Sequence, residues 1–219
     1  MSLLKSSIAR KVAMALSALF LLVFLLQHFT INITSVFSEK TFNEWSHFMG
    51  TNPLVQFALQ PILIFGVVFH FVMGFVLEIK NKNARGINYA KYNGGANASW
   101  MSRNMIWSGL VILAFVVLHF IDFWFPEMNY KYVEFLPEDP NRYHHELVEK
   151  FHSPLRVGAY VLAFIFLMLH LLHGFSSAFQ SVGFNNKYTS AIKKIGKAYA
   201  VLIPLGFIFI ALFHHFNAH

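Results

Sequence analysis

Apolar residues dominate five long segments of the chain, and each of these segments lacks Asp, Glu, Lys and Arg. The segments are residues 12–38, 45–77, 104–121, 157–186 and 198–219. A helix needs about 20 apolar residues to cross the hydrocarbon core of a bilayer. The pattern therefore predicts an all-α integral membrane protein with five transmembrane helices.

The polar segments between these spans are short. Residues 80–103 form a basic loop rich in Gly and Asn, and residues 125–156 form the longest connection, with four prolines. We expect a short helix around residues 143–151, lying along the membrane or capping the bundle. The chain has no stretch long enough for a soluble domain, so residues 1–219 are predicted to be one domain, a four-helix bundle of the first four spans with the fifth span peripheral.

Composition and charge placement support this interpretation. Hydrophobic residues make up 56% of the chain and charged residues 12%, which is unlike a soluble domain. The net charge is +7, but 12 of the 17 Lys and Arg residues fall in the segments on one side of the predicted spans, with 9 of the 10 acidic residues on the other side. The positive-inside rule then predicts a cytoplasmic N-terminus and an external C-terminus. The excess of basic residues is therefore explained by membrane orientation, and nucleic-acid binding is not expected.

The chain contains no cysteine. Disulfides, thiolate metal sites and iron–sulfur ligation by this chain are therefore excluded. Any metal must be held by nitrogen or oxygen. The first span is longer than the core of a signal peptide, so we expect it to be retained.

Five histidines lie well inside the first four spans. They are His28, His70, His119, His170 and His173. Ionisable side chains are costly within a membrane and usually face the bundle interior, where they pair, conduct or ligate. One such histidine alone indicates an interhelical hydrogen bond, but a histidine from each of four helices indicates a shared site.

Counting residues from the cytoplasmic charges places these histidines at two depths. His28 lies 17 residues past Lys11 and His119 lies 16 past Arg103, which puts both roughly 25 Å from the inner charges. They share a level toward the outer face.

The other histidines lie closer to the cytoplasm. His70 is 10 residues before Lys80, while His173 is 14 and His170 is 17 residues before Lys187. This count favours His173 over His170 as the partner of His70.

Two histidine pairs on neighbouring helices, at two levels, match the requirement of two haems that each take one imidazole from either side. A porphyrin needs small residues near its ligands, and Gly66, Gly74 and Gly174 lie close to His70 and His173 in sequence. Close helix packing is the alternative role for these glycines. Haem propionates need cations or donors, and the candidates are Arg156 at the outer end and Ser17, Arg103 and Trp107 at the inner end.

The whole chain resembles the cytochrome b membrane anchor of succinate dehydrogenases and fumarate reductases, in its single-polypeptide, five-helix, two-haem bacterial form. The resemblance rests on the four-helix histidine pattern, the topology, the size and the stretch LHGFSSAFQSVGF at residues 172–184. It implies that His70 and His173 bind the proximal haem b, and that His28 and His119 bind the distal haem b.

The resemblance also implies a role and partners. Such a subunit does not act on succinate itself; it passes electrons between a cytoplasmic iron–sulfur subunit and menaquinone or another quinone, in the bacterial cytoplasmic membrane. A flavoprotein subunit completes the complex, which can form higher oligomers. Candidates for the quinone site near the outer haem are Glu39, Glu44 and His47.

Two alternatives belong to other classes. One is the quinone-linked dihaem cytochrome b of a formate dehydrogenase or hydrogenase. The other is a transporter that relays protons through histidines, which needs acidic residues within the spans. Asp122, at the margin of one span, is the candidate acid for such a relay.

Overall fold

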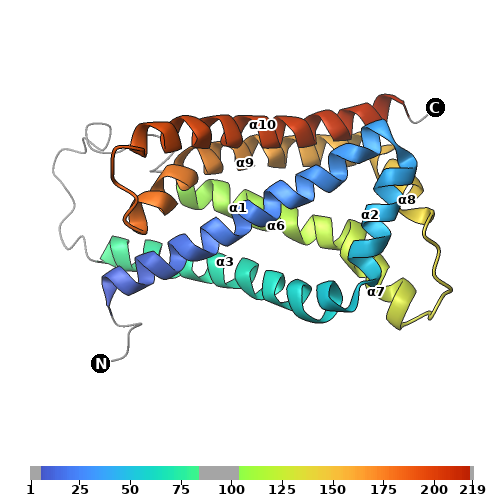
Figure 1. The fold of residues 1–219 in the computed structure, drawn as a ribbon, viewed down its shortest axis with the longest axis horizontal. Helices are drawn as coiled ribbons and strands as arrows, with labels where there is room; N and C mark the ends of the chain where they lie inside the picture. Colours follow the sequence, from blue (N-terminus) through green and yellow to red (C-terminus); the bar gives the residue numbers. More distant parts are fainter. Residues whose placement is uncertain (1–5, 84–103, 218–219) are drawn as a thin grey trace.

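Five helices in the computed structural model are long and apolar enough to cross a membrane (Figure 1). The structure describes residues 6–83 and 104–217 and has no β-strand within these ranges. The membrane-length segments are α1 (Ser7–Phe37), η2 with α3 (Val55–Asn83), α6 with η3 and α7 (Met105–Tyr132), α9 (Pro154–Ser181) and α10 (Thr189–Phe216). The predicted class, an all-α protein with five apolar helices of membrane-spanning length, is confirmed.

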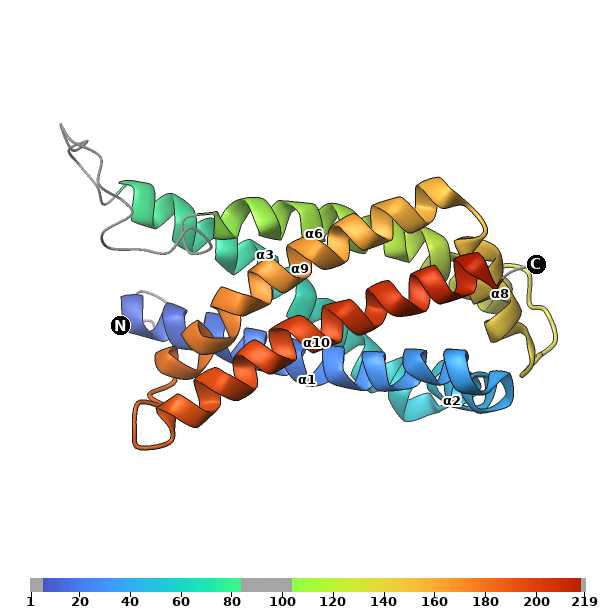
Figure 2. The same cartoon turned by 90° about the horizontal axis from the view of Figure 1, so that it is seen from above.

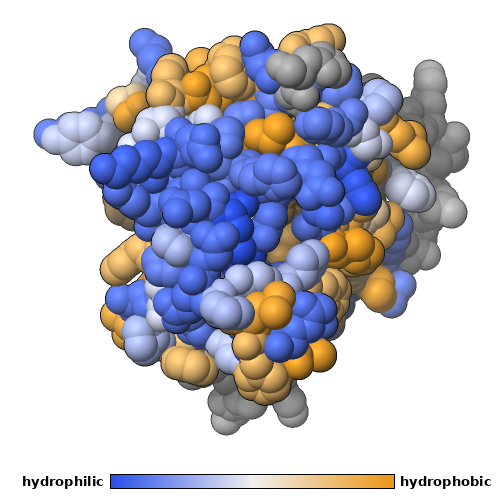
Figure 3. All heavy atoms as spheres, turned by 90° about the vertical axis from the view of Figure 1, so that its right-hand side faces the viewer, coloured by the Kyte–Doolittle hydropathy of each residue, from blue (hydrophilic) through white to orange (hydrophobic). Residues whose placement is uncertain are grey.

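The two ends of the bundle differ in chemistry. The start of α1, the end of α3 and the α9–α10 turn lie at one end of the bundle (Figures 1 and 2). These helix ends carry Arg10, Lys11, Lys80 and Lys82. We call this the basic end. The short helices α2 (Glu39–Thr51), α7 (Phe125–Tyr132) and α8 (Arg142–Phe151) cover the opposite, capped end. Hydrophilic side chains gather on the capped end (Figure 3). The positive-inside rule predicts that the basic end is cytoplasmic.

The segment predicted as one span at 45–77 is divided between α2 and a separate span formed by η2 and α3. Asn52 ends α2, and its Oδ1 accepts hydrogen bonds from the N–H groups of Leu54 and Val55 at 3.0 and 3.3 Å. Pro53 disfavours helical backbone at the residue before it. The prediction was wrong here because residues 45–51 of α2 carry no formal charge. The charge-free pattern therefore did not separate this amphipathic helix from the span that follows it.

The third span continues past its predicted end at residue 121. The α-helix α6 (Met105–His119) passes into a π-helical turn, η3 (Phe120–Trp124), and then into α7. Pro126 lacks an N–H and its ring crowds the carbonyl four residues earlier, which disfavours regular α-helix at this point. The π turn keeps the helix continuous and brings Asp122 into the interior, where it is buried.

Helix α8 confirms the short helix expected at 143–151. It buries Leu147 and Phe151 against the bundle. Asn43 of α2 is buried and links α2 to the start of α8. Its Oδ1 accepts a hydrogen bond from the N–H of His144 at 2.8 Å, and its Nδ2 donates to the carbonyl of Asn141 at 3.1 Å. α2 and α8 therefore form one cap.

The fifth span is not peripheral, which corrects the sequence prediction. Helix α10 packs against α9 and α1, and 39% of its most apolar window is buried, compared with 6% for α1. A Cβ atom at Gly196 would clash with Phe175, and one at Gly206 would clash with Phe29. These glycines allow the close approach of α10 that the sequence pattern did not reveal.

Candidate functional site

His28 of α1 and His119 of α6 face each other in the half of the bundle nearer the capped end. Their ring centroids are 5.7 Å apart and the rings are perpendicular. Aromatic rings surround them: Phe24 stacks on His28 at 5.4 Å, Phe207 of α10 lies 5.8 Å from His28, and Phe123 lies 5.2 Å from His119. We call His28 and His119 the capped-side pair.

His70 of α3 and His170 of α9 face each other nearer the basic end, with ring centroids 6.4 Å apart. Each ring has a serine beside it. The Oγ of Ser17 lies 3.1 Å from Nδ1 of His70, and the Oγ of Ser108 lies 3.1 Å from Nδ1 of His170. We call His70 and His170 the basic-side pair.

The structure brings His170, and not His173, to His70. The predicted pairing with His173 counted depth from Lys187, which lies six residues beyond the end of α9 at Ser181. Counted to the ends of the helices, His70 lies 13 residues before Asn83, His170 lies 11 before Ser181, and His173 lies 8 before it. His170 therefore matches the depth of His70.

Small residues surround His170. A Cβ at Gly109 would lie 3.9 Å from Cε1 of His170, and one at Gly174 would lie 4.0 Å from its Cδ2. Gly66 and Gly74 instead face Phe20 and Met14 of α1. From the sequence, Gly174 was expected to lie beside His173. In the structure, Gly174 and Gly109 lie beside the ring of His170.

All four paired imidazoles are half-buried, although they lie within membrane-length helices. Helix α3, which carries His70, buries Gly66 alone among its described residues. In addition, Nδ1 of His119 is buried without a hydrogen-bond partner in the described part of the chain. An unsatisfied buried polar atom costs about 1–3 kcal/mol. The paired imidazoles are thus partly exposed, and His119 has a buried nitrogen whose hydrogen-bonding capacity is unmet within the described residues.

The number of donors distinguishes a bare metal ion from a metal held in a macrocycle. Among the described residues, no group of three or more His, Asp or Glu side chains is placed to hold a metal ion. A protein zinc site needs three or four such ligands. Two facing imidazoles instead suit a metal whose other donors come from a prosthetic group.

The ring separations agree with this interpretation. Metal–imidazole nitrogen bonds of about 2.0–2.1 Å place the centroids of two rings on opposite sides of a metal roughly 6 Å apart. The observed separations are 5.7 Å in the capped-side pair and 6.4 Å in the basic-side pair. The donor chemistry and the spacing thus fit two haems.

Arg156, the predicted outer propionate partner, binds a buried carboxylate. Its Nη1 lies 3.0 Å from Oδ1 of Asp122, whose side chain is 1% exposed. The hydroxyl of Tyr160 donates to Oδ2 of Asp122 at 2.8 Å, and the Tyr160 ring lies 6.4 Å from that of His119. Asp122 is therefore compensated by a cation and a donor, which is unlike an acid in a proton relay.

Of the three predicted inner propionate partners, the structure describes Ser17 and Trp107. Ser17 is bound to His70, and Trp107 is 64% exposed on the surface of α6. Arg103 lies outside the described residues.

The three predicted quinone-site residues lie on α2 but face different partners. Glu39 is 4.0 Å from Nδ1 of His144, Glu44 pairs with Lys40 at 3.8 Å, and Nε2 of His47 lies 3.9 Å from Oε2 of Glu138. His47 also lines a polar pocket of about 340 Å³ at the capped end. The structure does not assemble the trio into one site.

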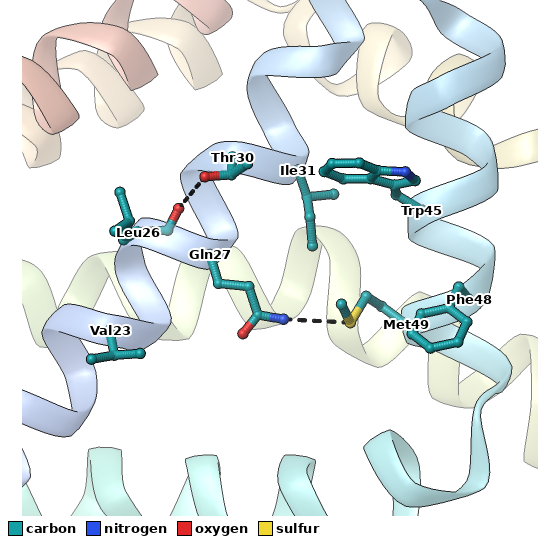
Figure 4. A pocket seen from close by; sticks show the side chains of 8 residues that line it. All are labelled: Val23, Leu26, Gln27, Thr30, Ile31, Trp45, Phe48 and Met49. Atoms are coloured by element: carbon teal, nitrogen blue, oxygen red, sulfur yellow. Dashed lines mark hydrogen bonds between the residues drawn. The ribbon is translucent and has the colours of Figure 1, made fainter.

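A larger, apolar groove lies between α1 and α2 (Figure 4). Its volume is about 750 Å³, within the range of small-molecule sites. Its polar groups are the side chains of Gln27 and Thr30 and the indole N–H of Trp45. Thr30 donates its hydroxyl to the carbonyl of Leu26 at 2.8 Å. The Gln27 amide contacts the sulfur of Met49 at 3.6 Å, a weak acceptor. Gln27 precedes His28, so the groove adjoins the capped-side pair on the same helix.

Sequence reasoning missed two of these residues, since neither Ser108 nor Gln27 was singled out. The role expected for His170 was an interhelical hydrogen bond, and its Nδ1 lies 3.1 Å from Oγ of Ser108 on α6. Gln27 carried a usable signal, because an amide inside an apolar span is costly unless it has a function or partner. Ser108 carried none, since small polar residues are common in membrane helices.

Comparisons with protein-family models, curated proteins and solved structures each found no match for this chain. The class that the fold and site define is a five-helix membrane protein with two facing histidine pairs.

Proposed function

We propose that this chain is the membrane-anchor cytochrome b of a succinate:quinone oxidoreductase and that it holds two b haems. The observation that carries the proposal is the pairing of four imidazoles from four helices, at two levels of one bundle, with ring separations of 5.7 and 6.4 Å. The ligands proposed are His28 and His119 for one haem and His70 and His170 for the other.

A bound haem would supply reversible one-electron chemistry without proton transfer to the protein. The chain's own residues provide axial nitrogens, exclude water and place the two sites in series between the ends of the bundle. Aromatic packing by Phe24, Phe123 and Phe207 around the capped-side pair keeps that site apolar. The chain contributes no group that acts on succinate.

Arg156 is the proposed partner of an acidic substituent on the capped-side haem. A guanidinium carries five N–H donors, so it can serve carboxylates on two sides. Asp122 and Tyr160 hold it in place from one side.

The groove between α1 and α2 is the proposed quinone site. An apolar slot accepts the ring and tail, and the Gln27 amide can donate to a quinone oxygen in place of its weak contact with Met49. This replaces the trio of Glu39, Glu44 and His47, whose side chains point to separate partners.

The proposed partners are an iron–sulfur subunit at the basic end and, beyond it, a flavoprotein subunit. They rest on the family resemblance together with the end-to-end charge difference, as does the bacterial cytoplasmic membrane as location. The dihaem subunit of another quinone-linked dehydrogenase has the same site chemistry, and copurification of the partner subunits distinguishes the two.

The test is a haem count on purified protein and on single His→Leu variants. A reduced-minus-oxidised spectrum should show two haems b per chain in the wild type and one in each of H28L, H70L, H119L and H170L. H173L is the matched control, three residues from a proposed ligand, and should retain two. A wild-type protein without haem, or the loss of a haem in H173L but not in H170L, contradicts the proposal.

A further inference from the structure

The two serines of the basic-side pair share an arrangement that determines the protonation of their histidines. The hydroxyl of Ser17 donates to the carbonyl of Met14 at 2.8 Å, and that of Ser108 donates to the carbonyl of Met105 at 2.9 Å. A serine hydroxyl has one proton. Each Oγ must therefore accept a hydrogen bond from Nδ1–H of the histidine that it contacts at 3.1 Å.

This assignment leaves Nε2 of both His70 and His170 as a lone pair. In a neutral imidazole one nitrogen carries the proton, and the partner of that nitrogen decides which one does. Two serines on two different helices thus select the same tautomer on two facing rings. The capped-side pair differs, since Nδ1 of His119 has no hydrogen-bond partner within the described residues.

We infer that Ser17 and Ser108 are positioning residues that hold His70 and His170 with Nε2 available for ligation and set the redox potential of the group bound between them. The inference rests on the proposed function. A hydrogen bond from the distal N–H makes a ligating imidazole more basic. A more basic ligand favours ferric iron, so the serines lower the midpoint potential of the basic-side haem.

A redox titration of S17A and S108A tests the inference. Each variant should raise the midpoint potential of the basic-side haem and leave that of the other haem unchanged. In the double variant the increase should be about the sum of the two single increases, because the two serines act on opposite ligands. The conservative variants S17T and S108T retain a hydroxyl and should restore the wild-type potential. The electron paramagnetic resonance signal of the same haem should change in the Ala variants and return in the Thr variants.

Ser35 provides a matched control. Its hydroxyl donates to the carbonyl of Asn32 at 2.7 Å and lies 2.8 Å from Nε2 of His214, so it has the same kind of contact away from both pairs. S35A should leave both potentials unchanged.

The outcomes separate the two proposals. A wild-type protein without haem overturns the proposed function itself. Two haems with potentials that S17A and S108A do not move overturn the inference alone, as does an equal shift in S35A. Loss of a haem from S17A but not from S17T supports the inference, whereas loss from both overturns it.

Discussion

Arg142 of α8 joins α8 to α7 at the capped end. Its Cζ lies 4.1 and 4.5 Å from the ring centroids of Tyr130 and Tyr143. The guanidinium pairs with Glu127 and with Glu146, the latter at 2.7 Å, and its side chain is 10% exposed. Burial alone would lower the pKa of Arg142, but hydrogen bonds and charges from the two glutamates raise it above its ordinary value. It is therefore cationic at physiological pH.

Replacing Arg142 by Met should destabilise the protein by about 1–3 kcal/mol, because Glu127, whose side chain is 18% exposed, loses one of its two cationic partners and retains Lys131. Thermal unfolding in lipid nanodiscs measures this. The control is Lys40→Met, which breaks the exposed Lys40–Glu44 pair and should change stability little. Equal melting temperatures for the two variants would contradict the buried network.

Replacing Gln27 by Leu should slow quinone turnover by the assembled complex about two- to tenfold, the worth of one neutral hydrogen bond. The haem count and both potentials should stay as in the wild type, since Gln27 faces the groove. Thr30→Val is the matched control in the same groove, because the Thr30 hydroxyl already donates its proton to the carbonyl of Leu26. A turnover loss in T30V equal to that in Q27L would argue against a specific role for the amide.

At the residue scale, the candidate site was largely predictable. His28, His70 and His119 stood out because intramembrane histidines are rare and costly. The choice between His170 and His173 needed the end of α9, which depends on the turn after Ser181 rather than on the position of a lysine. The serine contacts depend on helix rotation, which spacing alone does not give.

Helices α9 and α10 form the most buried pair of elements in the described structure. Ala200 and Ala211 are fully buried, and Tyr199 donates its hydroxyl to the carbonyl of Leu22 at 2.6 Å. Small residues on α10 allow this contact with both α9 and α1. The sequence predicted the five long helices from hydropathy, but not this packing, since hydropathy does not distinguish lipid-facing from helix-facing surface.

Gly196→Ala should destabilise the protein by about 1–3 kcal/mol, because the new methyl group meets the buried ring of Phe175. Gly158→Ala on α9 is the matched control, since a Cβ there has no atom within 4 Å. Melting temperatures of the two variants give the comparison. A stable G196A variant would mean that α10 packs more loosely than the structure has it.

At the scale of the whole molecule, the charge difference between the ends predicts orientation. The chain has no cysteine, so single cysteines are clean probes. Lys40→Cys at the capped end and Lys82→Cys at the basic end replace side chains that are 85% and 67% exposed. An impermeant maleimide should label K40C on intact cells, and K82C after lysis. The opposite pattern would reverse the predicted topology.

The central claim, that two histidine pairs each hold a haem, is tested most directly by an experimental density map of the purified chain in lipid. We predict planar density between His28 and His119 and again between His70 and His170, with His173 unligated. Imidazole pairs in direct contact, with protein or lipid filling the space around them, would contradict the account.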